Sequence, residues 1–391
     1  MKSFRHLSPP LRIFHGGDSL KQLDRELERV GSHRAVIVCG NSLARQASLL
    51  EMIQDEAGGR CAGVHPGVTA HSPLPQVQAA AQELARLRAD AVIAVGGGSA
   101  VVTARAAAIL LAEGPDARAL CTARDPASGT LVSPKLMAPK LPQLVIPTTP
   151  TTATVKSGSA VLDPDEGRRL ALFDPKTRAS AVFVHPEFLD TPPWSLVTSA
   201  SLNTLAMAIE GLLSRSGDAF SDGLLMHAVR LLVDFMPQAE GADEGAARAE
   251  LMMASLLTGH ATDYTGAGIA IPLGHAISAR FHLDNGIANA VVLPHVIRFN
   301  APDAPEGIAK LAQALGLPRQ AGTQASAEAV AGAFEALFRR LGLPAGLGAL
   351  GVTKASLPAL AAVSMDDWFV RDNPRVVENA GELEDLLARA W

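Results

Sequence analysis

The sequence predicts an α/β domain followed by an all-helical domain, divided near residue 190. In the first half, short runs of β-branched residues alternate with stretches of helical periodicity, which is typical of a parallel sheet covered by helices. Beyond Pro192–Pro193, long Ala/Leu/Met stretches replace the strand signals. The length of 391 residues fits two domains of ordinary size. We therefore expect an α/β domain at residues 1–190 and a helical domain at residues 191–391.

The first half holds four predicted buried strands and a helix between the first two of them. The helix is expected at Pro75–Arg88, with proline in the first turn, where it is tolerated. The predicted strands are Arg34–Cys39, Ala91–Val95, Gln143–Ile146 and Ala181–Val184.

The second half is predicted to be a set of long helices. Ser326 stands just before the last of them, and its hydroxyl is expected to cap the first free N–H groups. The predicted helices are Leu196–Leu213, Gly223–Phe235, Glu244–Leu257, Ile287–Phe299 and Ala327–Leu341.

Composition excludes several classes of protein. The net charge of −5 without long one-signed blocks argues against nucleic-acid binding, and 4% aromatic residues leave little for base stacking. The three cysteines (Cys39, Cys61 and Cys121) have no paired spacing, which excludes a disulfide scaffold and fits a reducing cytoplasm. No signal peptide and no apolar run of about 20 residues is recognised. We expect a cytoplasmic enzyme without a membrane partner.

A glycine loop follows the second predicted strand and leads into a predicted helix at Ala100–Leu111. It consists of Gly96, Gly97, Gly98 and Ser99. Glycines let the backbone approach a phosphate closely, and a helix N-terminus offers unpaired N–H groups to the anion. A tight turn without a ligand is the alternative. The position between a strand and a helix favours phosphate binding.

A second motif, the threonine loop Ile146–Thr152 (IPTTPTT), follows the third predicted strand. Together with the glycine loop it resembles the iron-containing alcohol dehydrogenase family. Three further stretches match in order, at Leu202–Glu210, Gly286–His295 and Asp372–Arg375, as does the C-terminal Trp391. The resemblance implies the fold of dehydroquinate synthase, with an α/β nucleotide domain and a helical domain, and an oxidoreductase activity on small alcohols, aldehydes, ketones or oxo acids.

The resemblance also implies a nicotinamide cofactor, NAD or NADP. The implied cofactor-binding residues are the glycine loop, Gly40, Thr148, Thr149, Thr152 and Val161. Many NAD-specific relatives place an Asp at about the position of Gly40, where it binds the ribose 2′-hydroxyl. Without that carboxylate a 2′-phosphate is not repelled, which favours NADP, although no Arg or Lys follows closely to hold the phosphate.

The metal-binding pattern of the family is altered at every position. Typical members hold iron or zinc with one Asp and three His, whereas this chain has Asn203, Met207, Ile271 and Asn285 there. Amide and thioether groups suit such a cation poorly, and isoleucine cannot coordinate it. We expect no metal. Maleylacetate reductases resemble this chain in having Asn at the Asp position and work without the metal, but they keep histidines that are missing here.

Two residues are candidates for catalysis. His275 matches a family histidine close to the nicotinamide, and its imidazole can protonate a developing alkoxide. The alternative is a helix histidine bonded to a backbone carbonyl. Lys156, just after the threonine loop, is expected to supply the positive charge that a metal would bring.

Other positions also depart from the family. Val102 and Arg105 replace an Asp and a Lys, and Leu170 replaces a second Lys, beside Arg168 and Arg169. Either of these two arginines could reach the cofactor or form a surface ion pair. Glu210 is expected to anchor neighbouring helices outside the site.

Three functions follow from these observations. The first is a metal-independent NAD(P)-dependent reductase of a small carbonyl compound, with His275 as the proton donor. The second is a nucleotide-binding pseudoenzyme, and the third is a non-redox enzyme on the same fold. The retained loops favour the reductase, and the resemblance implies a homo-oligomer.

Overall fold

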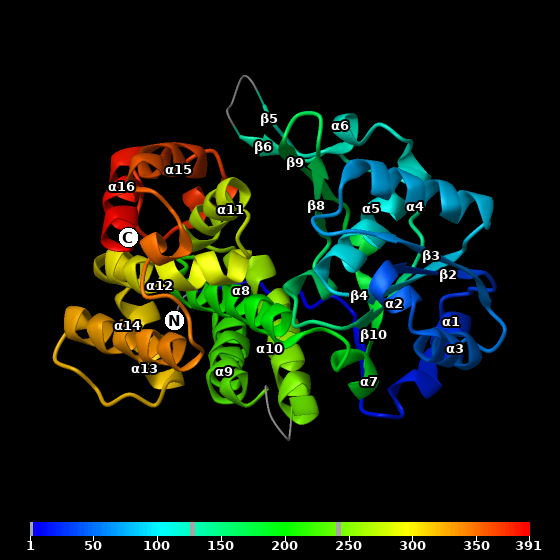
Figure 1. The fold of residues 1–391 in the computed structure, drawn as a ribbon, viewed down its shortest axis with the longest axis horizontal. Coiled ribbons are helices and arrows are strands. Elements are labelled where there is room, and N and C mark those ends of the chain that lie inside the picture. Colours follow the sequence, from blue (N-terminus) through cyan, green and yellow to red (C-terminus); the bar gives the residue numbers. More distant parts are fainter. Residues whose placement is uncertain (1–2, 126–129, 240–243) are drawn as a thin grey trace. The chain divides into compact units, whose positions relative to one another are not determined.

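The structure is a computed structural model that describes residues 3–125, 130–239 and 244–391. The chain divides into two compact units (Figure 1). The α/β unit spans Pro9–Pro193, and the helical unit spans Trp194–Trp391 together with the N-terminal segment that ends at Ser8. This segment was expected in the α/β domain. It joins the helical unit because the Tyr264 hydroxyl accepts a hydrogen bond from the Leu7 N–H, at 2.6 Å.

The α/β unit is built on a parallel sheet with the strand order β1-β10-β7-β4-β2-β3. The four predicted strands are present with ends shifted by one or two residues. β1 and β3 were not predicted, because β1 is a short, mostly exposed edge strand and β3 is interrupted by two glycines and a proline. The strands are β1 Arg12–His15, β2 Ala35–Gly40, β3 Cys61–Val68, β4 Ala91–Gly96, β7 Gln143–Pro147 and β10 Ala179–Val184.

Helices and two hairpins complete the α/β unit. The central strands β2 and β4 are buried at every residue but the last, as expected for a sheet covered on both faces. The helices are α1 Leu23–Arg29, α2 Asn41–Ala44, α3 Ala47–Glu56, α4 Leu74–Arg86, α5 Gly98–Glu113, α6 Ala117–Leu120 and α7 Pro186–Leu189. The hairpins pair β5 Ala123–Arg124 with β6 Leu131–Val132 and β8 Gly158–Asp163 with β9 Arg168–Phe173.

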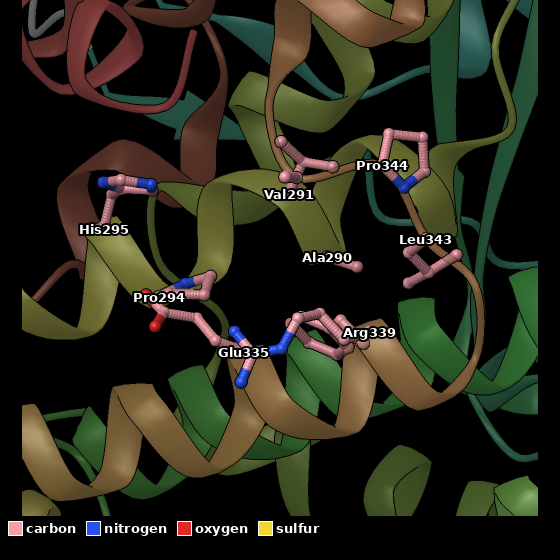
Figure 2. A pocket seen from close by; sticks show the side chains of 10 residues that line it. Ala290, Val291, Pro294, His295, Glu335, Arg339, Leu343 and Pro344 are labelled. Atoms are coloured by element: carbon pink, nitrogen blue, oxygen red, sulfur yellow. The ribbon is translucent and has the colours of Figure 1, made fainter.

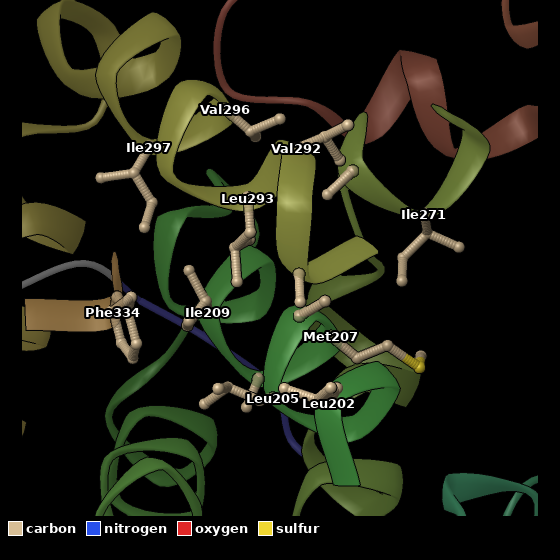
Figure 3. Packing of buried hydrophobic residues seen from close by; sticks show 14 of the residues in the cluster. Leu202, Leu205, Met207, Ile209, Ile271, Val292, Leu293, Val296, Ile297 and Phe334 are labelled. Atoms are coloured by element: carbon tan, nitrogen blue, oxygen red, sulfur yellow. The ribbon is translucent and has the colours of Figure 1, made fainter. Parts of the chain in front are cut away.

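Among the described residues, the helical unit contains the five predicted helices and four further α-helices. Figure 3 shows its core, in which α8 and α12 pack through Leu205, Ile209 and Leu293. The helices are α8 Trp194–Leu213, α9 Ala219–Phe235, α10 Glu244–Thr265, α11 Ala270–Phe281, α12 Asn285–Asn300, α13 Pro305–Ala314, α14 Thr323–Arg340, α15 Leu357–Ser364 and α16 Ala380–Arg389.

The close approach of α8 and α12 depends on one glycine. A Cβ atom on Gly286 would lie 1.8 Å from the backbone oxygen of Ser199, a distance that no side chain tolerates. This contact explains physically why glycine stands at the start of the matched stretch Gly286–His295.

The predicted cap of α14 is wrong. The helix begins at Thr323, and its N-cap is Gly322, whose φ of +98° suits glycine. Ser326 lies inside the first turn, where its hydroxyl donates to the Gly322 carbonyl at 3.0 Å. The first turn of the helix is mostly polar, so the hydrophobic periodicity begins only after the helix has started.

α8 also has the length and hydropathy of a membrane-crossing helix. The sequence analysis did not identify this apolar run. Of its most apolar window, 83% is buried inside the structure. Its apolar side chains therefore face neighbouring helices, as in the core helix of a globular unit.

Candidate active site

The glycine and threonine loops lie side by side at the carboxyl edge of the sheet. β4 and β7 are neighbours, with Gly96 opposite Pro147, so both loops leave the sheet at the same level. The Thr148 N–H donates to the Gly96 carbonyl at 3.0 Å. A Cβ atom on Gly97 would lie 2.8 Å from the Thr149 hydroxyl oxygen. The structure thus brings these two sets of predicted cofactor-binding residues together.

The glycine loop presents the N-terminus of α5. Gly96 has a φ of +139°, a conformation that favours glycine. Gly97 is the N-cap, and no side chain caps the helix or places an acid in its first turn. The first N–H groups of an uncapped helix attract an anion. This end of α5 therefore has the geometry of a phosphate-binding loop.

A strained turn supports the start of α5. Both His71 and Ser72 have positive φ values, +64° and +48°. The His71 N–H donates to the Ser99 hydroxyl at 3.2 Å, and the Ser72 hydroxyl donates to the Ser99 carbonyl at 3.0 Å. The sequence analysis did not predict this turn, because no glycine or asparagine marks its two left-handed positions.

The other predicted cofactor residues occupy different surroundings. Gly40 ends β2, next to β4, and so lies on the same edge as the two loops. Thr152 is buried at the start of the short helix η2, Thr152–Thr154. Val161 lies inside the β8–β9 hairpin with a fully buried side chain, opposite Leu170.

Arg105 clamps the segment that contains Lys156. The Arg105 side chain is fully buried and donates to the carbonyls of Ala153 and Gly158, both at 2.7 Å. These two residues flank Lys156, which is half-buried. The guanidinium at the family lysine position thus fixes the backbone on both sides of the predicted catalytic lysine.

The two arginines on β9 lie at the surface of the α/β unit. Arg168 is half-exposed and forms an ion pair with Glu166. Arg169 is also exposed, and Leu170 is fully buried.

His275 lies on α11, and its partner is a carboxylate rather than a backbone carbonyl. Its Nδ1 atom is 3.2 Å from Oδ2 of Asp367, and 29% of its side chain is exposed. Asp367 precedes the short helix η8, Trp368–Asp372, and its Oδ1 accepts the Phe369 N–H at 3.0 Å. Sequence reasoning missed Asp367, because 92 residues separate it from His275.

The four family ligand positions do not fit a metal ion. The side-chain amide of Asn203 lies 2.9 Å from the amide of a neighbouring residue, Asn289, and forms a hydrogen bond with it. Met207 and Ile271 are buried among hydrophobic side chains (Figure 3). Asn285, at the start of α12, adds only a neutral amide. Among the described residues, no three His, Cys, Asp or Glu side chains are grouped to hold a metal.

Glu210 anchors the helix that carries His275. It is buried on α8, and its Oε1 accepts the Ala270 N–H at 2.6 Å, at the start of α11. Burial raises the pKa of Glu210 to about 7, and the carboxylate of Asp367 adds to the shift.

A cavity of about 140 Å³ lies in the helical unit between α12 and α14 (Figure 2). His295 and Glu335 line it, along with mostly apolar residues, and burial lowers the pKa of His295. None of the predicted site residues lines this cavity.

Comparisons with known proteins identify the family. The model described as iron-containing alcohol dehydrogenase matches residues 10–186, and that of the C-terminal part of the Fe-containing alcohol dehydrogenase family matches residues 197–391. The two models together cover almost the whole chain. The chain belongs to the iron-containing alcohol dehydrogenase family, as the sequence motifs indicated.

Named relatives align over nearly their full lengths. Lactaldehyde reductase of Escherichia coli (strain K12) is 28% identical, over 96% of this chain and 97% of its own. NAD-dependent methanol dehydrogenase of Bacillus methanolicus is 25% identical, over 94% and 95%. Maleylacetate reductase of Burkholderia cepacia is 27% identical, over 97% and 95%.

The fold is confirmed by solved structures. A 1,3-propanediol oxidoreductase superposes with a TM-score of 0.91 and 22% identity, covering 100% of both chains. The predicted combination of an α/β part and a helical part is therefore correct.

Proposed function

We propose that this chain is an NAD(P)-dependent reductase of a small aldehyde, ketone or oxo acid that works without a metal ion. In this reaction a hydride passes from the nicotinamide to the carbonyl carbon, and a proton passes to the carbonyl oxygen. His275 is the proposed proton donor and Lys156 the proposed source of positive charge. The pairing of the glycine loop with the threonine loop at an uncapped helix N-terminus is the observation that carries the proposal.

The cofactor proposal rests on these loops and on family membership. Gly97 and Gly98 let the glycine loop pack closely against the hydroxyls of Thr149 and Thr151, and the related methanol dehydrogenase is named as NAD-dependent. At the end of β2, Gly40 provides no carboxylate to repel a 2′-phosphate. We infer that NADP is preferred over NAD.

Metal independence is inferred from the chemistry of the four ligand positions. A hard or borderline dication requires charged or imidazole ligands, and these positions offer two amides, a thioether and a hydrocarbon. Without a Lewis acid, the charge on the reduced oxygen must be neutralised by a proton and by fixed positive charge. His275 and Lys156 are the residues proposed for these roles.

The test is NADPH and NADH oxidation by chelator-treated protein with a panel of small aldehydes and oxo acids. We expect turnover to survive the chelator and to be unchanged when iron or zinc is added back. NADPH should be the better cofactor. Turnover that disappears with the chelator and returns with metal would contradict metal independence. Cofactor binding without turnover on any substrate would favour the pseudoenzyme or the non-redox enzyme.

The proposed role of Lys156 predicts a specific kinetic defect. Replacing Lys156 with Met should lower kcat by about 10²-fold, because a fixed charge aimed at a developing oxyanion typically contributes that much. The variant should remain folded, as its melting curve would show, because the hydrogen bonds of Arg105 that hold this segment are untouched. Lys135→Met, which removes an exposed lysine of the same unit, is the matched control. Equal kcat in the two variants would exclude Lys156 from catalysis.

A further inference from the structure

The strongest unassigned arrangement in the helical unit is the pair formed by His275 and Asp367. The two side chains come from α11 and from the segment that leads into η8. Their polar atoms, Nδ1 and Oδ2, are 3.2 Å apart. The Asp367 side chain is 17% exposed, so its carboxylate is largely shielded from water. An interaction between charged groups is screened less in such a place than on the open surface.

We propose that Asp367 is a positioning residue that holds the proton of neutral His275 on Nδ1 and leaves Nε2 for the substrate. A carboxylate can only accept a hydrogen bond, so Nδ1 must carry the proton that joins the two side chains. The remaining nitrogen, Nε2, then has a lone pair in the neutral ring. This inference deepens the proposed function and rests on it for its catalytic meaning.

The consequence for the chemistry is a directed proton path. In alcohol oxidation, the hydroxyl proton passes to Nε2 while a hydride leaves the carbinol carbon for the oxidised nicotinamide, giving the carbonyl compound, NAD(P)H and imidazolium. Carbonyl reduction is the reverse, with Nε2 of the imidazolium as the donor. In both directions the carboxylate of Asp367 stabilises the positive ring.

The local hydrogen bonds make Asp367→Asn an unusually informative variant. Oδ1 of Asp367 accepts the Phe369 N–H at 3.0 Å. An asparagine would keep its oxygen on that N–H and turn its NH₂ group toward Nδ1. The ring would then have to accept at Nδ1 and carry its proton on Nε2. Side-chain size hardly changes, but the tautomer is reversed.

The kinetic test compares Asp367→Asn with Asp366→Asn. Asp366 is the neighbouring exposed acid, and its substitution makes the same change in charge. We expect Asp367→Asn to lower the rate of alcohol oxidation by about 10²-fold or more, the usual contribution of a general base. Asp366→Asn should retain the wild-type rate. Equal oxidation rates in wild type and Asp367→Asn would overturn the proposal.

The spectroscopic test needs no activity and no variant at position 367. Nitrogen chemical shifts of ¹⁵N-histidine-labelled protein distinguish the two tautomers, and a His275→Gln sample identifies this ring among the 11 histidines. We expect neutral His275 to carry its proton on Nδ1 in the wild type. A proton on Nε2 would overturn the pairing. A wild type that shows the Nδ1 tautomer but no turnover would instead contradict the proposed reductase.

Discussion

Replacing Arg105 with Met is expected to lower the unfolding free energy of the α/β unit by about 3 kcal/mol, because two hydrogen bonds from a charged donor are lost. The variant leaves the carbonyls of Ala153 and Gly158 without these donors, in part-buried surroundings. Methionine fills most of the space but cannot donate. Loss of the hydrogen bond to Ala153 should also make the threonine loop less rigid and weaken cofactor binding, since Ala153 directly follows that loop.

The measurement uses the cysteines, all three of which lie in the α/β unit. Cys39 is fully buried, and burial raises its pKa to about 11, so its thiol is inert while the unit is folded. Labelling of Cys39 at increasing denaturant therefore reports unfolding of this unit. Arg45→Met, at an exposed position, should leave the labelling midpoint unchanged. Equal midpoints for the two variants would show that the clamp contributes nothing.

The resemblance to the family implies lysine at this position, and Arg105→Lys is a graded test of the two hydrogen bonds. A lysine has one terminal nitrogen, whereas Nη1 and Nη2 of Arg105 reach two different carbonyls. We expect the lysine variant to lie between wild type and Arg105→Met in stability. A variant as stable as the wild type would mean that one donor is enough.

Strands and helices were predictable where one residue pattern, continuous or periodic, extends over a whole element. β2 and β4 are unbroken apolar runs, because the sheet is covered on both faces. β3 escaped recognition, since Gly63, Pro66 and Gly67 interrupt it and its side chains are only half-buried. α10 continues to Thr265, beyond its predicted end at Leu257. The additional residues are mostly polar, so the apolar pattern on which the prediction depends stops before the helix does.

The candidate site was predictable where the chain itself carries the signal. The glycine and threonine loops each follow a strand, and parallel pairing alone places them together. Asp367 and the backbone partners of Arg105 could not be found in this way. Each depends on a contact between distant segments, and no local pattern at Asp367 distinguishes it from the exposed Asp366 beside it.

Glu210 predicts a dependence of stability on pH in the helical unit. Its pKa is about 7 in the folded protein against an ordinary value of 4.5. A raised pKa means that the folded state binds the proton more tightly than the unfolded state. The stabilisation is therefore complete below about pH 4.5 and is lost as the pH rises through about 7. One pKa unit corresponds to about 1.4 kcal/mol, so the loss amounts to about 3 kcal/mol.

Glu210→Gln should remove this dependence, because glutamine keeps an oxygen to accept the Ala270 N–H but has no charge to desolvate. The variant should match the wild type at about pH 4 and exceed its stability by about 3 kcal/mol at about pH 8. All three tryptophans belong to the helical unit, so tryptophan fluorescence during denaturant unfolding reports on it. Glu250→Gln, on α10, controls for the general change in charge. Parallel pH profiles for wild type and Glu210→Gln would mean that the buried carboxyl does not titrate in this range. Glu210 would then keep one protonation state over this range while it holds the start of α11, the helix that carries His275.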